Sequence, residues 1–385
     1  MNFWIGYYLF SLAALLFTIF SPKYTKVVLA IYLFSIWFIG AFRYMYGADY
    51  YMYELLFESG NADAVLFSAP SIEPTFYMMV DLYNELGLSY QAMFVTYETI
   101  VLFFFYKGLD VFFQTGRQRL MMTLLYATTT LTGGYFFGLN GMRQAAAMSI
   151  LFFASKYVLS HDLKRFIIFF TISVLFHYSA VLFFPIYFLS RKKIPSTCAI
   201  IGVLLSFCLT ITGVTQRIFF SVVSTLATIY GKYEGQIDLL NVDAGTFPPS
   251  SLFTLIVFLF ILFLYYRDKI FNKDDCEIST YLYNASVVYV CFRTLMSFVV
   301  EGSNVAAIIH RFEIYFLFLF FAFIVYVLRV RRLYLQVGFL IVWILVFGIV
   351  NLKSFYNGIY DPLITIPPSV ATDKVEDQFN FELFR

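Results

Sequence analysis

The chain has 385 residues, of which 61% are hydrophobic and only 13% are charged. Soluble proteins carry roughly 25% charged residues, so this composition excludes an ordinary soluble domain and predicts a polytopic membrane protein. The formal net charge of +2 leaves no strongly basic surface for nucleic acid. The four cysteines show neither a metal spacing nor a disulfide pattern: Cys198, Cys208, Cys276 and Cys291.

Apolar runs of about 20 residues recur along the chain and predict transmembrane helices. The first lacks a basic n-region and a cleavage site, so we expect it to be retained. We expect an all-α fold of about 10 full spans, forming one transmembrane domain over residues 1–350 with a C-terminal tail over residues 351–385. The runs are Phe3–Phe20, Val27–Phe42, Gln91–Tyr106, Leu120–Leu139, Gln144–Leu159, Ile194–Gly213, Leu252–Tyr266, Tyr281–Val300, Phe312–Leu328 and Leu333–Val350.

Lysine and arginine collect at alternate ends of these runs, which predicts the orientation of the chain. Basic clusters such as Arg191 to Lys193 and Arg329 to Arg332 mark the cytoplasmic side. The loops at about 43–90 and 214–251 and the C-terminal tail carry acidic or neutral balance. We therefore expect these loops and both termini to face outward.

One segment breaks this alternation. Phe166 to Leu189 is long enough for one crossing, yet both of its flanks are basic. The alternation is restored if this segment enters the membrane and returns as a hairpin of two short helices, broken at Phe176-His177-Tyr178-Ser179-Ala180. The break would place His177 and Ser179 at a hydrated cavity that faces outward. The alternative is a single tilted span followed by an inverted topology.

The first outer loop opens with a cluster of charged and aromatic residues. Arg43 is followed by Asp49 and by several tyrosines. If the segment is helical, one face carries Tyr46, either Asp49 or Tyr50, and Tyr53. Such residues suit a substrate that is part sugar and part phosphate, although an aromatic belt with a snorkelling arginine has the same composition. Later in the loop, Glu73 precedes Pro74, which predicts a helix start with a carboxylate at its positive end.

Ionisable residues within spans are costly, so each is a candidate for function. Arg143 begins a span with Asn140 as a predicted helix cap, an arrangement that favours phosphate, although snorkelling to headgroups is the alternative. Arg293, Ser297 and Glu301 have helical spacing and form either an internal ion pair or part of a site. Arg311 and Tyr315 share a face at the next span start, and a second outer arginine suits a pyrophosphate.

His177 is the one histidine inside an apolar hairpin. A core histidine satisfied by a backbone carbonyl is the plain interpretation, and a catalytic base is the functional one. Asp49 and Glu73 are the carboxylates best placed to act as a base from the first loop. Between His177 and Asp49 the choice stays open, with a preference for His177.

Several of these motifs, in this order, resemble the EpsG family, which belongs with the Wzy-type polymerases of O-antigen and exopolysaccharide. The resemblance covers roughly Phe3 to Val350. It rests on the run from Arg43 to Tyr53, on Asn140-Gly-Met-Arg-Gln-Ala, on Phe176-His-Tyr-Ser-Ala and on Arg311-Phe-Glu-Ile-Tyr. It implies a fold related to the multispan, lipid-donor (GT-C-like) glycosyltransferases, in the bacterial inner membrane with a periplasmic active site.

The resemblance also implies the reaction, which joins undecaprenyl-pyrophosphate-linked oligosaccharide units. Because arginines can neutralise the diphosphate and no metal-binding pattern occurs in the sequence, we expect no metal or other cofactor. A chain-length regulator and a flippase of the same pathway are the implied partners beside the lipid bilayer. We expect the pyrophosphate to be contacted by Arg143, Arg311, Arg43 and Arg293. The candidates for the catalytic base are His177, Asp49 and Glu73. The expected sugar contacts are Tyr46, Tyr50, Tyr53, Asn140, Gln144, Ser179 and Tyr315. A lipid-linked oligosaccharide flippase and an O-antigen ligase remain alternatives.

Overall fold

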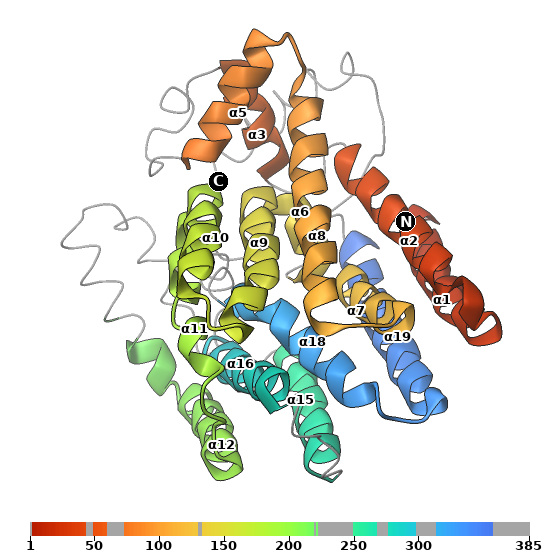
Figure 1. Ribbon diagram of the computed structural model, residues 1–385, viewed down its shortest axis with the longest axis vertical. Coiled ribbons are helices and arrows are strands. Elements are labelled where there is room, and N and C mark those ends of the chain that lie inside the picture. The colour runs from red at the N-terminus through yellow and green to blue at the C-terminus, as the bar shows by residue number, and fades with distance from the viewer. Residues whose placement is uncertain are drawn as a thin grey trace.

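The computed structural model describes residues 2–43, 49–59, 73–129, 133–218, 221, 249–267, 276–297 and 313–356. Every regular element in these ranges is a helix, as predicted (Figure 1). The α-helices are α1 (Asn2–Phe20), α2 (Thr25–Ala41), α3 (Asp49–Ser59), α5 (Pro74–Glu85), α6 (Tyr90–Phe112), α7 (Gly116–Thr128), α8 (Gly134–Asn140), α9 (Met142–Leu159), α10 (Leu163–Phe176), α11 (Ile186–Leu189), α12 (Ser196–Ile211), α15 (Pro249–Arg267), α16 (Cys276–Leu295), α18 (Leu317–Leu328) and α19 (Leu333–Tyr356). Short 3₁₀ segments are η1 (Pro22–Tyr24), η2 (Tyr178–Phe183) and η5 (Ile314–Phe316).

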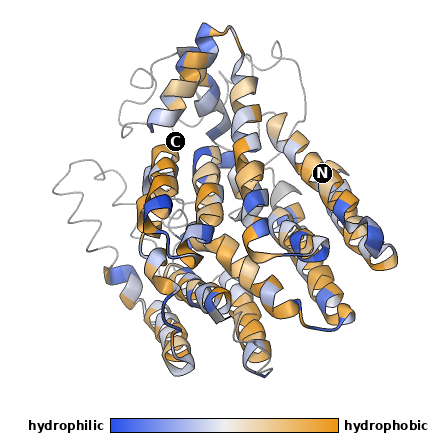
Figure 2. Cartoon of the chain, viewed as in Figure 1, coloured by the Kyte–Doolittle hydropathy of each residue, from blue (hydrophilic) through white to orange (hydrophobic). Residues whose placement is uncertain are grey.

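The chain is a helical membrane protein. Within the described residues, 4 helices are long and apolar enough to cross a bilayer: Phe3–Phe20, Pro22–Ala41, Tyr90–Phe112 and Leu333–Lys353. Shorter apolar helices accompany them. Hydrophobic residues run along the helices and hydrophilic ones gather near many of their ends (Figure 2). Large apolar side chains such as Leu9, Phe34 and Phe263 are exposed, as expected of surfaces that face lipid.

The centre of the bundle is formed by α18, whose residues are all buried from Leu317 to Leu328. A helix that is apolar all round can only be stable at the centre of a bundle or in lipid. Beside it, the rings of Phe105, Tyr126 and Phe318 join α6, α7 and α18, with centroids 4.6 to 5.4 Å apart. Helix α9 packs between α6 and α10. Helices α3 and α5 lie together at one end of the molecule, beyond α9 and α10 (Figure 1).

The predicted continuous span Leu120–Leu139 was wrong, because it divides into α7 and α8. Helix α8 begins at Gly134, whose φ of +60° is in the left-handed region. A Cβ there would lie 2.4 Å from the carbonyl oxygen of Tyr126. Only glycine tolerates this conformation and this close approach, so the chain turns here instead of continuing as one helix.

The predicted hairpin was confirmed. Helix α10 ends at Phe176, His177 adopts extended backbone with φ −159° and ψ 118°, and η2 and α11 follow. Phe166 contacts Tyr187 at 5.1 Å and Phe170 contacts Phe184 at 5.3 Å between ring centroids. Residue numbers that rise on one arm as they fall on the other indicate an antiparallel return, with His177 at its tip.

The first and last described helices close the bundle. Helix α19 continues to Tyr356, past the predicted start of the tail at Asn351. The buried amide of Asn351 donates to the carbonyl of Thr129 at 2.9 Å and to the hydroxyl of Tyr8 at 2.5 Å. These bonds give the buried NH2 group of Asn351 two acceptors, which allows the helix to continue past this polar residue.

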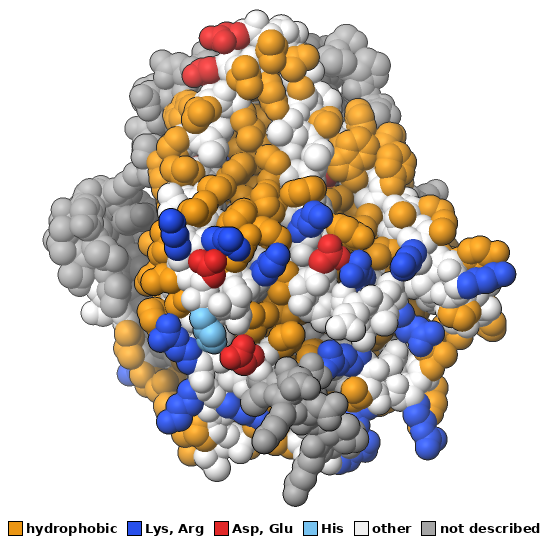
Figure 3. Space-filling view, viewed as in Figure 1, with side chains coloured by type: hydrophobic (Ala, Val, Ile, Leu, Met, Phe, Trp, Pro, Cys, Tyr) orange, Lys and Arg blue, Asp and Glu red, His pale blue; other side chains and the backbone are white. Residues whose placement is uncertain are grey.

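Basic side chains are unevenly distributed. Figure 3 shows Lys and Arg in a band across the middle and lower part of one face, with acidic side chains both within this band and at the end where α5 lies. This uneven distribution agrees with the charge segregation that the sequence predicts, whereas the direction of the chain in a membrane stays a prediction.

Candidate functional site

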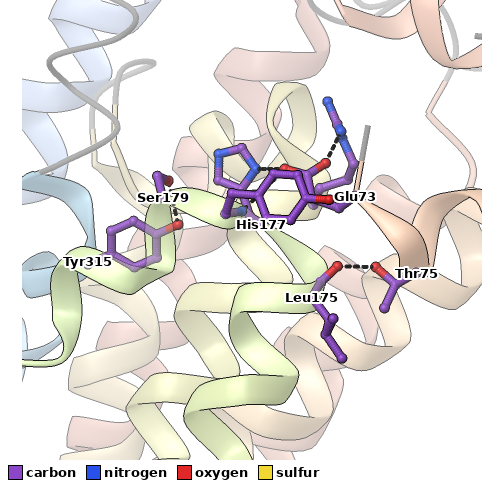
Figure 4. Close-up of polar contacts among 8 residues, drawn as sticks. Glu73, Thr75, Leu175, His177, Ser179 and Tyr315 are labelled. Atoms are coloured by element: carbon purple, nitrogen blue, oxygen red, sulfur yellow. Dashed lines mark hydrogen bonds and ion pairs between the residues drawn. The ribbon is translucent and has the colours of Figure 1, made fainter. Parts of the chain in front are cut away.

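Three charged side chains from distant parts of the chain meet at the tip of the hairpin. Glu73 directly precedes α5, Arg143 lies in the first turn of α9, and His177 follows α10. Nδ1 of His177 lies 2.5 Å from Oε1 of Glu73, and a guanidinium nitrogen of Arg143 contacts the other carboxylate oxygen (Figure 4). One carboxylate therefore binds a histidine and an arginine at the same time.

The local sequence explains why the side chain of Glu73 reaches from the start of α5 to the hairpin tip. Pro74 occupies the first turn of α5, as predicted, and Glu73 is its N-cap residue with extended backbone. The Glu73 side chain makes no cap bond to its own helix. Instead Oε1 also accepts a hydrogen bond from the backbone N–H of Tyr178 at 3.4 Å. The carboxylate thus joins the start of α5 to the hairpin tip.

The three charged side chains are largely buried, and Arg143 is the most exposed of them. The side chains of Glu73, His177 and Arg143 are 5%, 12% and 23% exposed. Burial disfavours the ionised form of Glu73, but the hydrogen bond from His177 and the charge of Arg143 outweigh it. The pKa of Glu73 is therefore held below its ordinary value.

This arrangement assigns the tautomer of a neutral His177. Because Nδ1 donates to the carboxylate, the lone pair of the neutral ring is on Nε2. A carboxylate beside the opposite nitrogen also stabilises the imidazolium that forms when Nε2 accepts a proton. The pair can therefore act as a general base, with a guanidinium close by.

Two further bonds hold the hairpin tip (Figure 4). The hydroxyls of Ser179 and Tyr315 lie 2.8 Å apart and connect η2 to η5. On the other side, the hydroxyl of Thr75 donates to the carbonyl of Leu175 at 2.8 Å. The structure thus brings Ser179 and Tyr315, both predicted sugar contacts, together in one hydrogen bond.

Aromatic rings surround the guanidinium of Arg143. Its Cζ lies 5.6 Å from the ring centroids of both Tyr53 and Phe76. Tyr53 is 3% exposed, and Tyr50 is 1% exposed with its ring stacked on Phe94 at 5.1 Å. Of these two predicted sugar-binding tyrosines, Tyr53 is the one in contact with the charged site.

The first loop is fastened to α8 by Asn140. Its Oδ1 accepts the backbone N–H of Asp49 at 3.0 Å. The prediction that Asn140 caps the helix of Arg143 was wrong, because Gly141 is the N-cap of α9. The bond to Asp49 occupies the amide oxygen that would have served as the cap. Asp49 lies one turn before Tyr53 on α3, so both residues are on the same side of that helix.

The other two expected pyrophosphate arginines within the described residues are buried and have other partners. Arg43 is 3% exposed, donates to the carbonyl of Gly40 at 2.5 Å and lies 4.3 Å from the Phe94 ring. Arg293 forms an ion pair with Glu313 beside a cavity of about 30 Å³. Arg293 thus has a partner from the next span, while Glu301, the partner expected from helical spacing, lies outside the described residues.

Sequence reasoning missed one buried carboxylate. Glu98, on α6, is 4% exposed and lies close to Gly40 and in the field of Arg43. A lone glutamate inside an apolar run was a sufficient signal, because ionisable residues in spans are rare. Of the remaining predicted site residues, Gln144 is buried at 2% exposure, and Tyr46 and Arg311 lie outside the described residues.

Comparison with known proteins agrees with the resemblance in the motifs. The model of the EpsG family matches residues 26–362. The chain belongs to the EpsG family. The match spans α2 to α19 and therefore includes all three charged residues at the hairpin tip of this EpsG-family protein. No curated protein and no solved structure matches the chain.

Proposed function

We propose that this EpsG-family protein is a Wzy-type polymerase. It joins undecaprenyl-pyrophosphate-linked repeat units at the periplasmic face of a bacterial inner membrane. The observation that carries the proposal is the contact of one carboxylate with His177 and Arg143 at the tip of a broken hairpin. It supplies a proton acceptor beside a cation, which are the two groups that glycosyl transfer from a lipid pyrophosphate requires.

In the proposed reaction, the acceptor hydroxyl gives its proton to Nε2 of His177 while its oxygen bonds to the anomeric carbon of the donor sugar. The bond from that carbon to the pyrophosphate oxygen breaks. The leaving pyrophosphate departs with the electron pair, and Arg143 and Arg311 neutralise its charge. Glu73 holds His177 in the required tautomer, and Asp49, on the face of α3 that carries Tyr53, orients the acceptor sugar.

The proposal includes the finer architecture implied by the family resemblance. The chain would contain about ten spans related to lipid-donor glycosyltransferases, with the hairpin tip open to the periplasm. The outer loop over residues 214–251 would recognise the glycan. A chain-length regulator and a flippase of the same pathway would be its partners.

The purified protein, given a defined lipid-linked repeat unit, tests the proposal. We expect stepwise chain growth that His177→Gln slows by about 10²- to 10⁴-fold while binding of the lipid-linked repeat is kept. Transfer of the glycan to lipid A core would identify a ligase instead. Movement of the lipid-linked unit across a vesicle bilayer without growth would identify a flippase.

A further inference from the structure

A hollow lies at the other end of α6 and α9 from the charged site. Lys156 follows Arg143 along α9 by 13 residues, which corresponds to about 20 Å of helix. The hollow is a groove of about 980 Å³ between α6, α9, α10 and the start of α16. Its position separates it from the proposed reaction.

Aromatic rings form one side of the groove. Phe104 contacts Phe153 at 5.7 Å and Phe169 at 6.3 Å, and Phe153 contacts Phe169 at 5.1 Å between centroids. These rings come from α6, α9 and α10. Phe103, 54% exposed, continues the apolar surface toward the outside of the bundle. Ile168, on α10, is also exposed, so the apolar wall is continuous with surface that faces lipid.

The charged side of the groove carries two lysines and two carboxylates, and Arg119 beside it supplies a third cation. Its two carboxylates have partners, since Asp110 pairs with Arg119 at 2.8 Å and Glu277 contacts His161 at 3.2 Å. Its two amines, on Lys107 and Lys156, have no carboxylate within ion-pair distance among the described residues. Nζ of Lys107 lies 5.8 Å from the Phe103 ring, at the boundary of the apolar wall. The groove thus combines an aromatic wall with two lysines that have no ion-pair partner in the described part of the chain.

We propose that this groove binds an anionic phospholipid. The headgroup phosphate contacts Lys107 and Lys156, and an acyl chain lies along Phe103, Phe104 and Phe169. Charge complementarity selects an anion, and the aromatic wall that opens toward lipid selects one with a hydrocarbon chain. A soluble phosphate would leave that wall exposed to water. Lys107 and Lys156 lie toward the ends of α6 and α9, on the side that the charge pattern predicts to be cytoplasmic, where anionic lipid of the adjacent leaflet is within reach.

Native mass spectrometry of the detergent-purified full chain tests this site. The probes are phosphatidylglycerol and phosphatidylcholine of equal chain length. Each lysine at an anionic surface contributes about fivefold to affinity, so Lys107→Gln with Lys156→Gln should weaken phosphatidylglycerol binding by roughly 25-fold. Binding of phosphatidylcholine should change much less, because its choline group balances the charge of the phosphate. Both lysines are exposed, so the double variant should keep the thermal midpoint of the wild type.

The matched control removes two basic charges from the same basic side but from another hollow, by Lys23→Gln with Lys26→Gln. It should retain the phosphatidylglycerol preference. Equal losses in both double variants would show general surface charge and would overturn the site. Unchanged phosphatidylglycerol binding in the groove variant would also overturn it, and so would a groove-dependent preference for polyprenyl diphosphate over phosphatidylglycerol, because it would name another occupant.

A third variant tests the acyl contact. Phe103→Ala should weaken binding of long-chain phosphatidylglycerol by severalfold and leave a dihexanoyl analogue unaffected, because the short chains barely reach the aromatic wall. Equal weakening of both lipids would contradict the proposed orientation of the chain.

Discussion

Glu73 illustrates how one side chain can serve several neighbours. Its oxygens hold Arg143 and His177, and its own backbone begins α5. A neutral isostere keeps the shape of the carboxylate but loses its charge, so Glu73→Gln separates the electrostatic role from the steric one. Glu85, which is exposed on the same helix, offers a matched control.

We expect Glu73→Gln to lower kcat for chain growth by about 10²- to 10³-fold, with little change in binding of the lipid-linked repeat. Without the carboxylate, the imidazolium at His177 is no longer stabilised and its tautomer is no longer fixed. Glu85→Gln should behave as wild type. If Glu73→Gln mainly raised KM, the residue would act on substrate binding and not through His177.

The stability of the protein should also report on Glu73. Its pKa is lowered in the folded state, so the stability it contributes is present above its ordinary pKa and is lost as the pH falls through the folded value. Between about pH 5 and pH 3, the thermal midpoint of the wild type should fall more than that of Glu73→Gln. Glu85→Gln should follow the wild type, and parallel acid curves for wild type and Glu73→Gln would contradict the assignment.

At the scale of elements, close helix contacts depend on single glycines. Gly40 brings α2 against Glu98 on α6, and a Cβ at Gly40 would lie 2.4 to 2.8 Å from the atoms of that carboxyl group. Gly6, on α1, has no atom within 4 Å of its virtual Cβ. The two positions therefore distinguish a packing requirement from a general effect of alanine in a helix.

Gly40→Ala should destabilise the protein by about 1–3 kcal/mol, because the carboxyl group of Glu98 must move within a tightly packed contact. Gly6→Ala should be neutral or stabilising by up to about 1 kcal/mol, since alanine favours helix. Thermal unfolding in detergent measures both. Combining Gly40→Ala with Glu98→Ser should cost less than the sum of the single changes, and strict additivity would show that the two residues do not meet.

The hairpin was predictable from sequence because basic flanks on both sides of one apolar segment leave few topologies. The break near His177 followed because a hairpin must reverse close to the centre of that segment. The partners of His177 did not, because Glu73 is 104 residues away and meets it only when α5 packs on the hairpin. The break before Gly134 and the pairing of Arg293 with Glu313 were missed for a similar reason, since both depend on packing that periodicity does not encode.

At the scale of the whole molecule, basic side chains are concentrated in one part of the bundle. The basic band crosses one part, and α3 and α5 lie at an end with acidic side chains (Figures 1 and 3). If the positive-inside rule sets the orientation, α5 faces the periplasm and the start of α10 faces the cytoplasm.

Cysteine labelling in a background lacking the four native cysteines tests this orientation. Asp81→Cys, on the exposed side of α5, should react with an impermeant thiol reagent in intact spheroplasts. Lys164→Cys, at the start of α10, should react only after the membrane is opened. The reverse pattern would place the charged site on the cytoplasmic side and would exclude a periplasmic polymerase.

The hydroxyl of Thr75 holds the carbonyl of Leu175, just before α10 ends. Together with Glu73, it fastens the start of α5 to the hairpin tip at two points, one neutral and one ionic. A bulky glycan that entered by lifting α5 would release both fastenings in a single movement and would take the carboxylate away from His177. Entry and reaction would then exclude one another in time. Water that entered with the glycan would find His177 without its carboxylate partner and therefore unable to act as a base. The donor would thus be protected from hydrolysis until α5 had returned.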